Sequence, residues 1–204
     1  MFGVADYGAF VAAIIIFLAI PGPGNLAVIT STGKGGIRGG LAATLGIMGA
    51  DQLLMWLALA GVAALLATYP AAFHIVQWTG SAYLGWLGLR MLLAKAGSKP
   101  VLNIQPRHYF KQAGLITLLN PKAIVFYMAF FPLFVDPARH QGLLTFTVMA
   151  GTTAVLTFAY GLGVVLLTRH LAERMRANPM IGRVLEKLAG AFLLGFSVKL
   201  AISK

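Results

Sequence analysis

The sequence contains no cysteine and very little negative charge. The absence of cysteine excludes disulfides, thiol redox chemistry, iron–sulfur clusters and cysteine-ligated zinc. Only 5 of the 204 residues are Asp or Glu, and charged residues make up 10% of the chain. A typical soluble domain is about 25% charged. This chain therefore cannot cover a water-facing surface, which excludes both a soluble globule and a disordered protein.

Histidine and phosphate-binding motifs are also missing from the apolar segments. His74, His108, His140 and His170 fall in expected loops or at segment ends, so no haem pair, proton relay or metal site is expected within the apolar segments. The run Gly33-Lys34-Gly35-Gly36 lacks the spacing of a nucleotide-binding loop. We therefore expect no metal, no cofactor, no ATP-driven step and no enzymatic activity.

Long apolar segments dominate what is present. Apolar residues make up 59% of the chain, and its mean hydropathy is +0.84. A helix needs roughly 20 residues to cross a bilayer core about 30 Å thick. Six segments qualify, and they predict an all-α membrane protein forming one polytopic domain over residues 1–204. They are Tyr7–Ser31, Gly40–Thr68, Phe73–Ala94, Gln112–Phe134, Leu143–Thr168 and Leu185–Ser203.

The positive charge orients these segments rather than indicating a nucleic-acid partner. The net charge is +11, but no basic face with interleaved aromatic residues is present. Most Lys and Arg residues follow the first, third and fifth segments or flank those gaps, whereas the other side has only Arg139 and Lys204. Because cytoplasmic loops are enriched in Lys and Arg, we expect a bacterial cytoplasmic-membrane protein with both termini outside.

The two halves of the chain, about 1–100 and 103–204, resemble each other. Residues Gly80–Trp86 and Gly190–Phe196 share the pattern Gly-small-x-x-Leu-Gly-aromatic. Pro21 and Pro121 interrupt the first and fourth segments, which enter the membrane from opposite sides. This pattern predicts an inverted three-plus-three repeat, an architecture common in secondary transporters. The alternative is a chance similarity between glycine-rich apolar segments.

Two predicted helix breaks are the candidate substrate site. Proline removes an N–H donor and glycine loosens the backbone, so neither sequence can continue a regular helix. Freed carbonyls can hold an ammonium group, and freed N–H groups can hold a carboxylate. The alternative is a pair of packing kinks without ligand contact. The first break contains Pro21, Gly22, Pro23, Gly24 and Asn25, and the second contains Asn120, Pro121 and Lys122.

Asp51 and Lys122 are the charges expected deepest in the membrane. By helical rise they lie roughly 17 Å and 15 Å into their segments. A lipid-exposed charge at that depth costs about 2.5–3.5 kcal/mol, so both should face the protein interior or an aqueous cavity. Asp51 is the one carboxylate well inside a segment and is the candidate proton carrier. The alternative is a static buried pair between Asp51 and Lys122.

The two breaks also carry a family resemblance. Pro21-Gly22-Pro23 and Asn120-Pro121-Lys122-Ala123, with Phe130–Asp136 after the second, resemble the motifs of the lysine exporter / homoserine–threonine resistance translocators. Gly46–Asp51 also fits the start of that family's second span. The chain departs from the family where Gly24 precedes Asn25 and where Leu133 replaces a frequent Gln.

The resemblance implies a six-span, dimeric exporter of amino acids or their derivatives, driven by proton exchange. The pattern is nearer to the leucine and homoserine/threonine exporters than to the basic amino-acid exporters. The expected partners are therefore a small zwitterionic amino acid, protons, the lipid bilayer and a second copy of the chain. A passive channel or cation carrier of the same fold is the alternative function, and a membrane enzyme is a further, weaker one.

Overall fold

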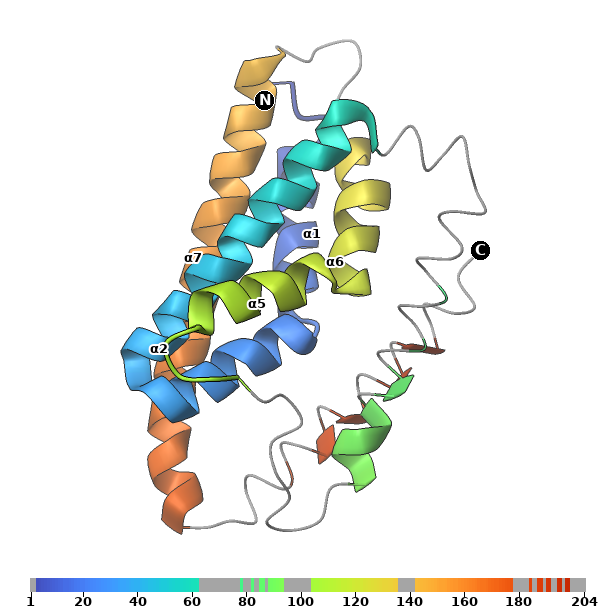
Figure 1. Ribbon diagram of the computed structural model, residues 1–204. Helices are drawn as coiled ribbons and strands as arrows, with labels where there is room; N and C mark the ends of the chain where they lie inside the picture. Colours follow the sequence, from blue (N-terminus) through green and yellow to red (C-terminus); the bar gives the residue numbers. More distant parts are fainter. Residues whose placement is uncertain are drawn as a thin grey trace.

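The computed structural model describes residues 3–62, 88–93, 104–135 and 142–177, with scattered positions between 78 and 86 and between 184 and 198. The described elements are all helical (Figure 1). They are α1 (Tyr7–Ala19), α2 (Pro23–Leu57), the π-helix η1 (Ala58–Val62), α5 (Tyr109–Leu118), α6 (Pro121–Val125), the π-helix η2 (Phe126–Phe130), the 3₁₀-helix η3 (Phe131–Phe134) and α7 (Leu143–Ala177).

Both predicted helix breaks are present. The Asp6 side chain caps α1 by accepting from the backbone N–H of Ala9 at 2.9 Å, and the helix ends at Ala19. Ile20 is extended because the proline that follows disfavours helical geometry, and α2 restarts with Pro23 in its first turn. The second break lies between α5 and α6. Asn120 is extended there, and its side chain caps the backbone N–H of Lys122 at 3.1 Å.

The prediction of a loop between the first two segments, at residues 32–39, is wrong. Residues 32–39 are helical except at Gly36, whose φ of 61° and ψ of −157° turn the chain within one residue. Such a φ suits glycine because it has no Cβ. Figure 1 shows the two arms of α2 running in different directions on either side of this bend. The second arm packs against α5 and α7.

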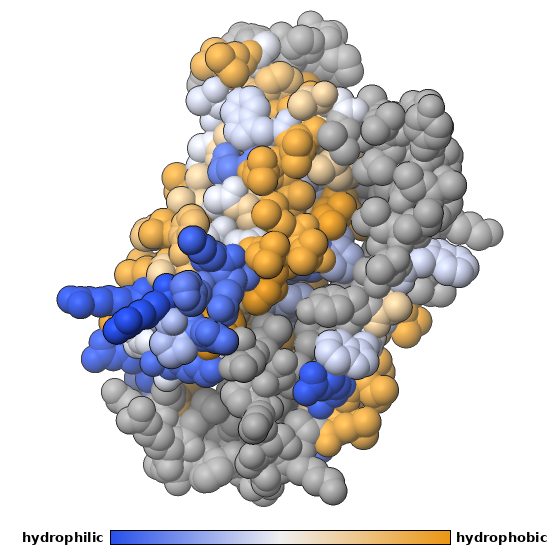
Figure 2. All heavy atoms as spheres, viewed as in Figure 1, coloured by the Kyte–Doolittle hydropathy of each residue, from blue (hydrophilic) through white to orange (hydrophobic). Residues whose placement is uncertain are grey.

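Among the described residues, several polar side chains are buried beside the apolar core and many large apolar side chains are exposed. The buried polar side chains include Asp51 and Lys122, while Leu115, Leu119 and Val155 are each more than half exposed. Figure 2 shows apolar side chains over much of the described surface, with hydrophilic ones gathered toward one end. The helical regions Pro23–Gly61 and Leu143–Leu171 are long and apolar enough to cross a membrane. This distribution fits a protein surrounded by lipid.

Two apolar clusters flank the helix breaks. The first joins α1, the end of α2, α6, η2 and α7 around Phe10, Phe17, Tyr127 and Phe131. In it the Phe17 and Phe126 rings stack with centroids 4.2 Å apart. The second cluster packs the start of α2 against α5 and α7 around Val28 and Val165. The breaks therefore lie between two apolar clusters.

The predicted segments Phe73–Ala94 and Leu185–Ser203, and with them most of the repeat pattern, lie largely outside the described residues. A few described positions there show contact between the two segments. A Cβ at Gly190 would lie 2.9 Å from the Gly88 carbonyl oxygen, and one at Gly85 would lie 2.8 Å from Ser197 Oγ. These glycines allow a close approach of the two segments.

Glycine also sets the contact between α2 and α5, which predicts a difference between two neighbouring substitutions. A Cβ at Gly46 would overlap the Phe110 carbonyl oxygen, whereas one at Gly49 would meet nothing within 4 Å. We expect Gly46→Ala to destabilise by about 1–3 kcal/mol through overpacking. Gly49→Ala should stabilise by roughly 0.5–1 kcal/mol through helix propensity. Melting of the detergent-purified variants checks both, and equal melting temperatures would contradict this packing.

Candidate functional site

The two helix breaks meet in space. A Cβ built on Gly22 would lie 3.4 Å from both Cε and Nζ of Lys122 and 3.8 Å from Nδ2 of Asn120. These distances are ordinary van der Waals contacts, so Gly22 lies directly beside Lys122. The predicted residues of the first break and those of the second thus form one continuous region, although about 100 residues separate them in the sequence.

Lys122 bridges this region. Its ammonium group donates to the carbonyl oxygens of Phe17 at 2.9 Å and Ile20 at 2.7 Å, and Nζ lies 4.5 Å from the centroid of the Phe17 ring. These carbonyls end α1, where the break removes the helical donors that would otherwise satisfy them. The side chain is 7% exposed. In this conformation Lys122 therefore occupies the freed carbonyls that the sequence analysis assigned to a substrate ammonium.

Asp51 lies in the second arm of α2 and is 1% exposed. Its Oδ2 atom accepts from Thr157 Oγ1 on α7 at 3.4 Å, and its Oδ1 atom has no hydrogen-bond partner within the described part of the chain. Lys122 and Tyr127 lie within electrostatic range of the carboxylate. Because the Lys122 ammonium is bonded to carbonyls, the two charges interact across space rather than as a direct ion pair.

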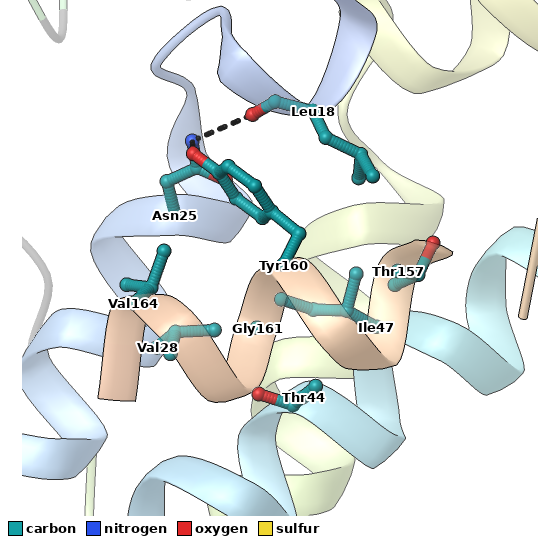
Figure 3. A pocket seen from close by; sticks show the side chains of 9 residues that line it. All are labelled: Leu18, Asn25, Val28, Thr44, Ile47, Thr157, Tyr160, Gly161 and Val164. Carbon is teal, nitrogen blue, oxygen red and sulfur yellow. Dashed lines mark hydrogen bonds between the residues drawn. The ribbon is translucent and has the colours of Figure 1, made fainter. Parts of the chain in front are cut away.

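Asn25 ties the first break to α7 (Figure 3). Its Nδ2 atom donates to the Leu18 carbonyl oxygen and to the Tyr160 hydroxyl, both at 3.1 Å. Its neighbour Gly24 lies against α5, where a Cβ would be 3.5 Å from Thr117 Oγ1. The Thr117 hydroxyl is itself buried without a partner among the described residues. The predicted Asn25 thus has a defined structural partner on a distant helix.

A cavity of about 20 Å³ lies beside Asn25. It mixes apolar walls with four polar side chains, and Figure 3 shows these residues converging from α1, α2 and α7. The lining residues are Leu18, Asn25, Val28, Thr44, Ile47, Thr157, Tyr160, Gly161 and Val164. In this conformation the cavity is too small for an amino acid but large enough for a water molecule.

The α7 side of this region was not predicted from the sequence. Met149, Thr153, Thr157, Gly161 and Val165 recur every four residues and are buried along one face of α7. Residues four apart lie on the same face of a helix, so this spacing could have revealed a polar face within the fifth segment. No group of three or more His, Cys, Asp or Glu side chains that could hold a metal occurs among the described residues.

The comparisons with known proteins agree with the motifs. The family model of the LysE type translocators matches residues 15–204. Leucine efflux proteins of Salmonella choleraesuis and Salmonella typhimurium are each 34% identical over 205 residues, covering 98% of this chain and 96% of the relative. The leucine efflux protein of Enterobacter sp. strain 638 is 33% identical, covering 98% and 97%. No solved structure matches the chain.

The family match covers nearly the whole sequence and includes both helix breaks and Asp51. The resemblance drawn from Pro21–Pro23 and Asn120–Ala123 is therefore confirmed. This chain belongs to the LysE type translocators and is a membrane transporter rather than an enzyme.

Proposed function

We propose that this protein exports neutral amino acids, leucine foremost, across the bacterial cytoplasmic membrane in exchange for protons. The substrate comes from the relatives, which are leucine efflux proteins covered over nearly their full length. The observation that carries the mechanism is the burial of Asp51 next to the joined helix breaks. A carboxylate held at such depth is costly, and in transporters such groups serve as proton carriers.

The substrate's charged ends would bind where the two breaks meet. The carbonyl oxygens of Phe17 and Ile20 already hold one ammonium group, that of Lys122. The α-ammonium of an amino acid has the same charge and the same three donors, so it would replace Lys122 there. Displaced Lys122 would then meet the substrate carboxylate. The substrate ammonium would then contact the carbonyl oxygens, and the substrate carboxylate would contact Lys122, as expected from the sequence. The present conformation would be the state without substrate.

Asp51 would link this exchange to proton movement. Loss of its proton leaves a negative charge within electrostatic range of Lys122, so the position of Lys122 and the protonation of Asp51 depend on each other. Movement of one half of an inverted six-helix repeat against the other would then expose the site to each side in turn. The paired breaks at Pro21–Asn25 and Asn120–Lys122 support that repeat.

The basic end of the molecule would face the cytoplasm. Lys34, Arg38, Arg107 and Lys111 are exposed around the contact between the α2 bend and the start of α5, where Lys34 Nζ donates to the Ile104 carbonyl oxygen at 2.9 Å. Figure 2 shows the hydrophilic side chains gathered at this end. The positive-inside rule then places the N-terminal end of α1 outside.

This orientation predicts a labelling pattern that the absence of native cysteine makes simple to measure. We expect Ala5→Cys to react with a membrane-impermeant maleimide on intact cells, and Arg38→Cys to react only after the cells are permeabilised. Ala5 and Arg38 are both exposed, so a difference in labelling would reflect the side of the membrane and not burial of the side chain. The opposite pattern would reverse the proposed orientation.

The proton-coupled export of leucine predicts a specific loss in Asp51→Asn. In cells fed a leucine-containing dipeptide, we expect the wild type to release leucine and Asp51→Asn to release little more than cells without the protein. Asp6→Asn is the matched control, because it removes a carboxylate outside the membrane and asparagine caps a helix as well as aspartate. Membrane levels of all three proteins are measured alongside.

Undiminished export by Asp51→Asn would remove Asp51 from the mechanism and leave the exporter assignment intact. Failure of the wild type to export leucine or any other neutral amino acid would instead contradict the proposed substrate class.

A further inference from the structure

Thr157 differs from its neighbours on α7 in the partner of its hydroxyl group. Thr147, Thr152 and Thr153 each donate to the carbonyl oxygen four residues earlier, at 2.8–2.9 Å. That bond is the ordinary choice for threonine inside a helix. Thr157 instead donates across the helix interface to Asp51 Oδ2 at 3.4 Å. Its hydroxyl thus touches the one buried carboxylate of the described residues.

The same Thr157 side chain lines the cavity beside Asn25. The cavity volume of about 20 Å³ exceeds the roughly 10–15 Å³ that one water molecule requires. A buried water also needs two to four polar partners, and the lining provides them in Asn25, Thr44, Thr157 and Tyr160. Thr157 therefore contacts both Asp51 and a water-sized cavity with mainly apolar walls.

The hydrogen-bonding capacity of these groups suits a relay. The Tyr160 hydroxyl oxygen accepts from Asn25, which leaves its proton to donate toward the cavity. The Thr157 hydroxyl has one donor, used on Asp51, and oxygen lone pairs that can accept from a water. Asn25 itself belongs to the first helix break, so the cavity adjoins the proposed substrate path.

We propose that this cavity binds a water molecule that carries protons between the helix break and Asp51 through the Thr157 hydroxyl. To protonate Asp51, the water takes up a proton from solvent as it gives one of its own to Thr157 Oγ1, and Thr157 gives its hydroxyl proton to Asp51 Oδ2. The water and Thr157 are thus left neutral. Release runs in reverse, and the proton leaves to solvent through the water. The proposal rests on the proposed proton exchange and makes Thr157 a positioning and relay residue for it.

Other titratable groups also face Asp51. Lys122 on α6 and Tyr127 in η2 interact with the carboxylate, and Tyr160 lies one turn along α7 at the cavity. The Lys122 ammonium is bonded to carbonyl oxygens, and the Oδ2 atom has its hydrogen bond from Thr157. Thr157 is therefore the group that connects Asp51 with the cavity.

The test compares two nearly isosteric substitutions one helical turn apart. Thr157→Val removes the relay hydroxyl, and Thr153→Val removes an equally buried hydroxyl that bonds only its own helix. Thr157→Ser restores a hydroxyl at the relay position. For each purified protein, a pH indicator in weak buffer follows proton release after leucine is added, and labelled leucine exchange in proteoliposomes follows transport without net proton movement.

We expect Thr157→Val to slow leucine-induced proton release by about tenfold to a hundredfold, the effect of losing one hydrogen bond to a charged group. Leucine exchange should stay near the wild-type rate, and Thr157→Ser and Thr153→Val should behave like the wild type. Proton release from Thr157→Val at the Thr153→Val rate would overturn the relay. An equal loss of exchange would also overturn it, by assigning Thr157 a structural role.

Failure of the underlying function gives a different result. If the wild type exchanges leucine but releases no proton, the proposed proton coupling fails and the relay fails with it. If the wild type releases protons and Thr157→Val releases them at the same rate, the proton coupling stands and only the relay is rejected.

Discussion

The bond between the Lys122 ammonium group and the end of α1 holds the two helix breaks together. Proline and glycine interrupt each helix, and every interruption leaves backbone groups without helical partners in a medium that cannot solvate them. Lys122 satisfies two of those groups, the carbonyl oxygens of Phe17 and Ile20, from the first turn of α6. The same hydrogen bonds stabilise the buried positive charge of Lys122. One interaction thus allows an irregular backbone and a buried cation to coexist inside the membrane.

Around this contact, polar side chains are buried beside an apolar core. Asp51 and Thr157 lie where α2 and α7 meet, and small residues let these helices approach closely, since a Cβ on Gly161 would overlap Thr44. Packed aromatic rings at Phe17 and Phe126 fix the end of α1 on the other side. In the proposed alternating-access cycle, movement of a helix break would therefore displace these polar groups with it.

The sequence predicts the breaks well because their cause is local. Proline disfavours helical geometry in the residue before it, so Ile20, Gly22 and Asn120 are extended without regard to distant contacts. The burial of Asp51 follows likewise from the cost of charge in lipid. The hydrogen-bond partners of the buried polar side chains could not be predicted, because they depend on how helices distant in sequence pack. That packing brings Thr157 to Asp51 and Lys122 to carbonyl oxygens, and the turn at Gly36 replaces an expected loop.

In the proposed mechanism, the carbonyl oxygens ending α1 form an ammonium site, which Lys122 fills when no substrate is bound. Lys122→Ala removes the side chain beyond Cβ, and n-propylamine matches the part removed. We expect n-propylamine to raise the melting temperature of purified Lys122→Ala in proportion to its occupancy of the site. Propionate and 1-propanol should not raise it, and the wild type should respond to none of the three. No stabilisation by the amine, or equal stabilisation by all three compounds, would contradict the proposed ammonium site.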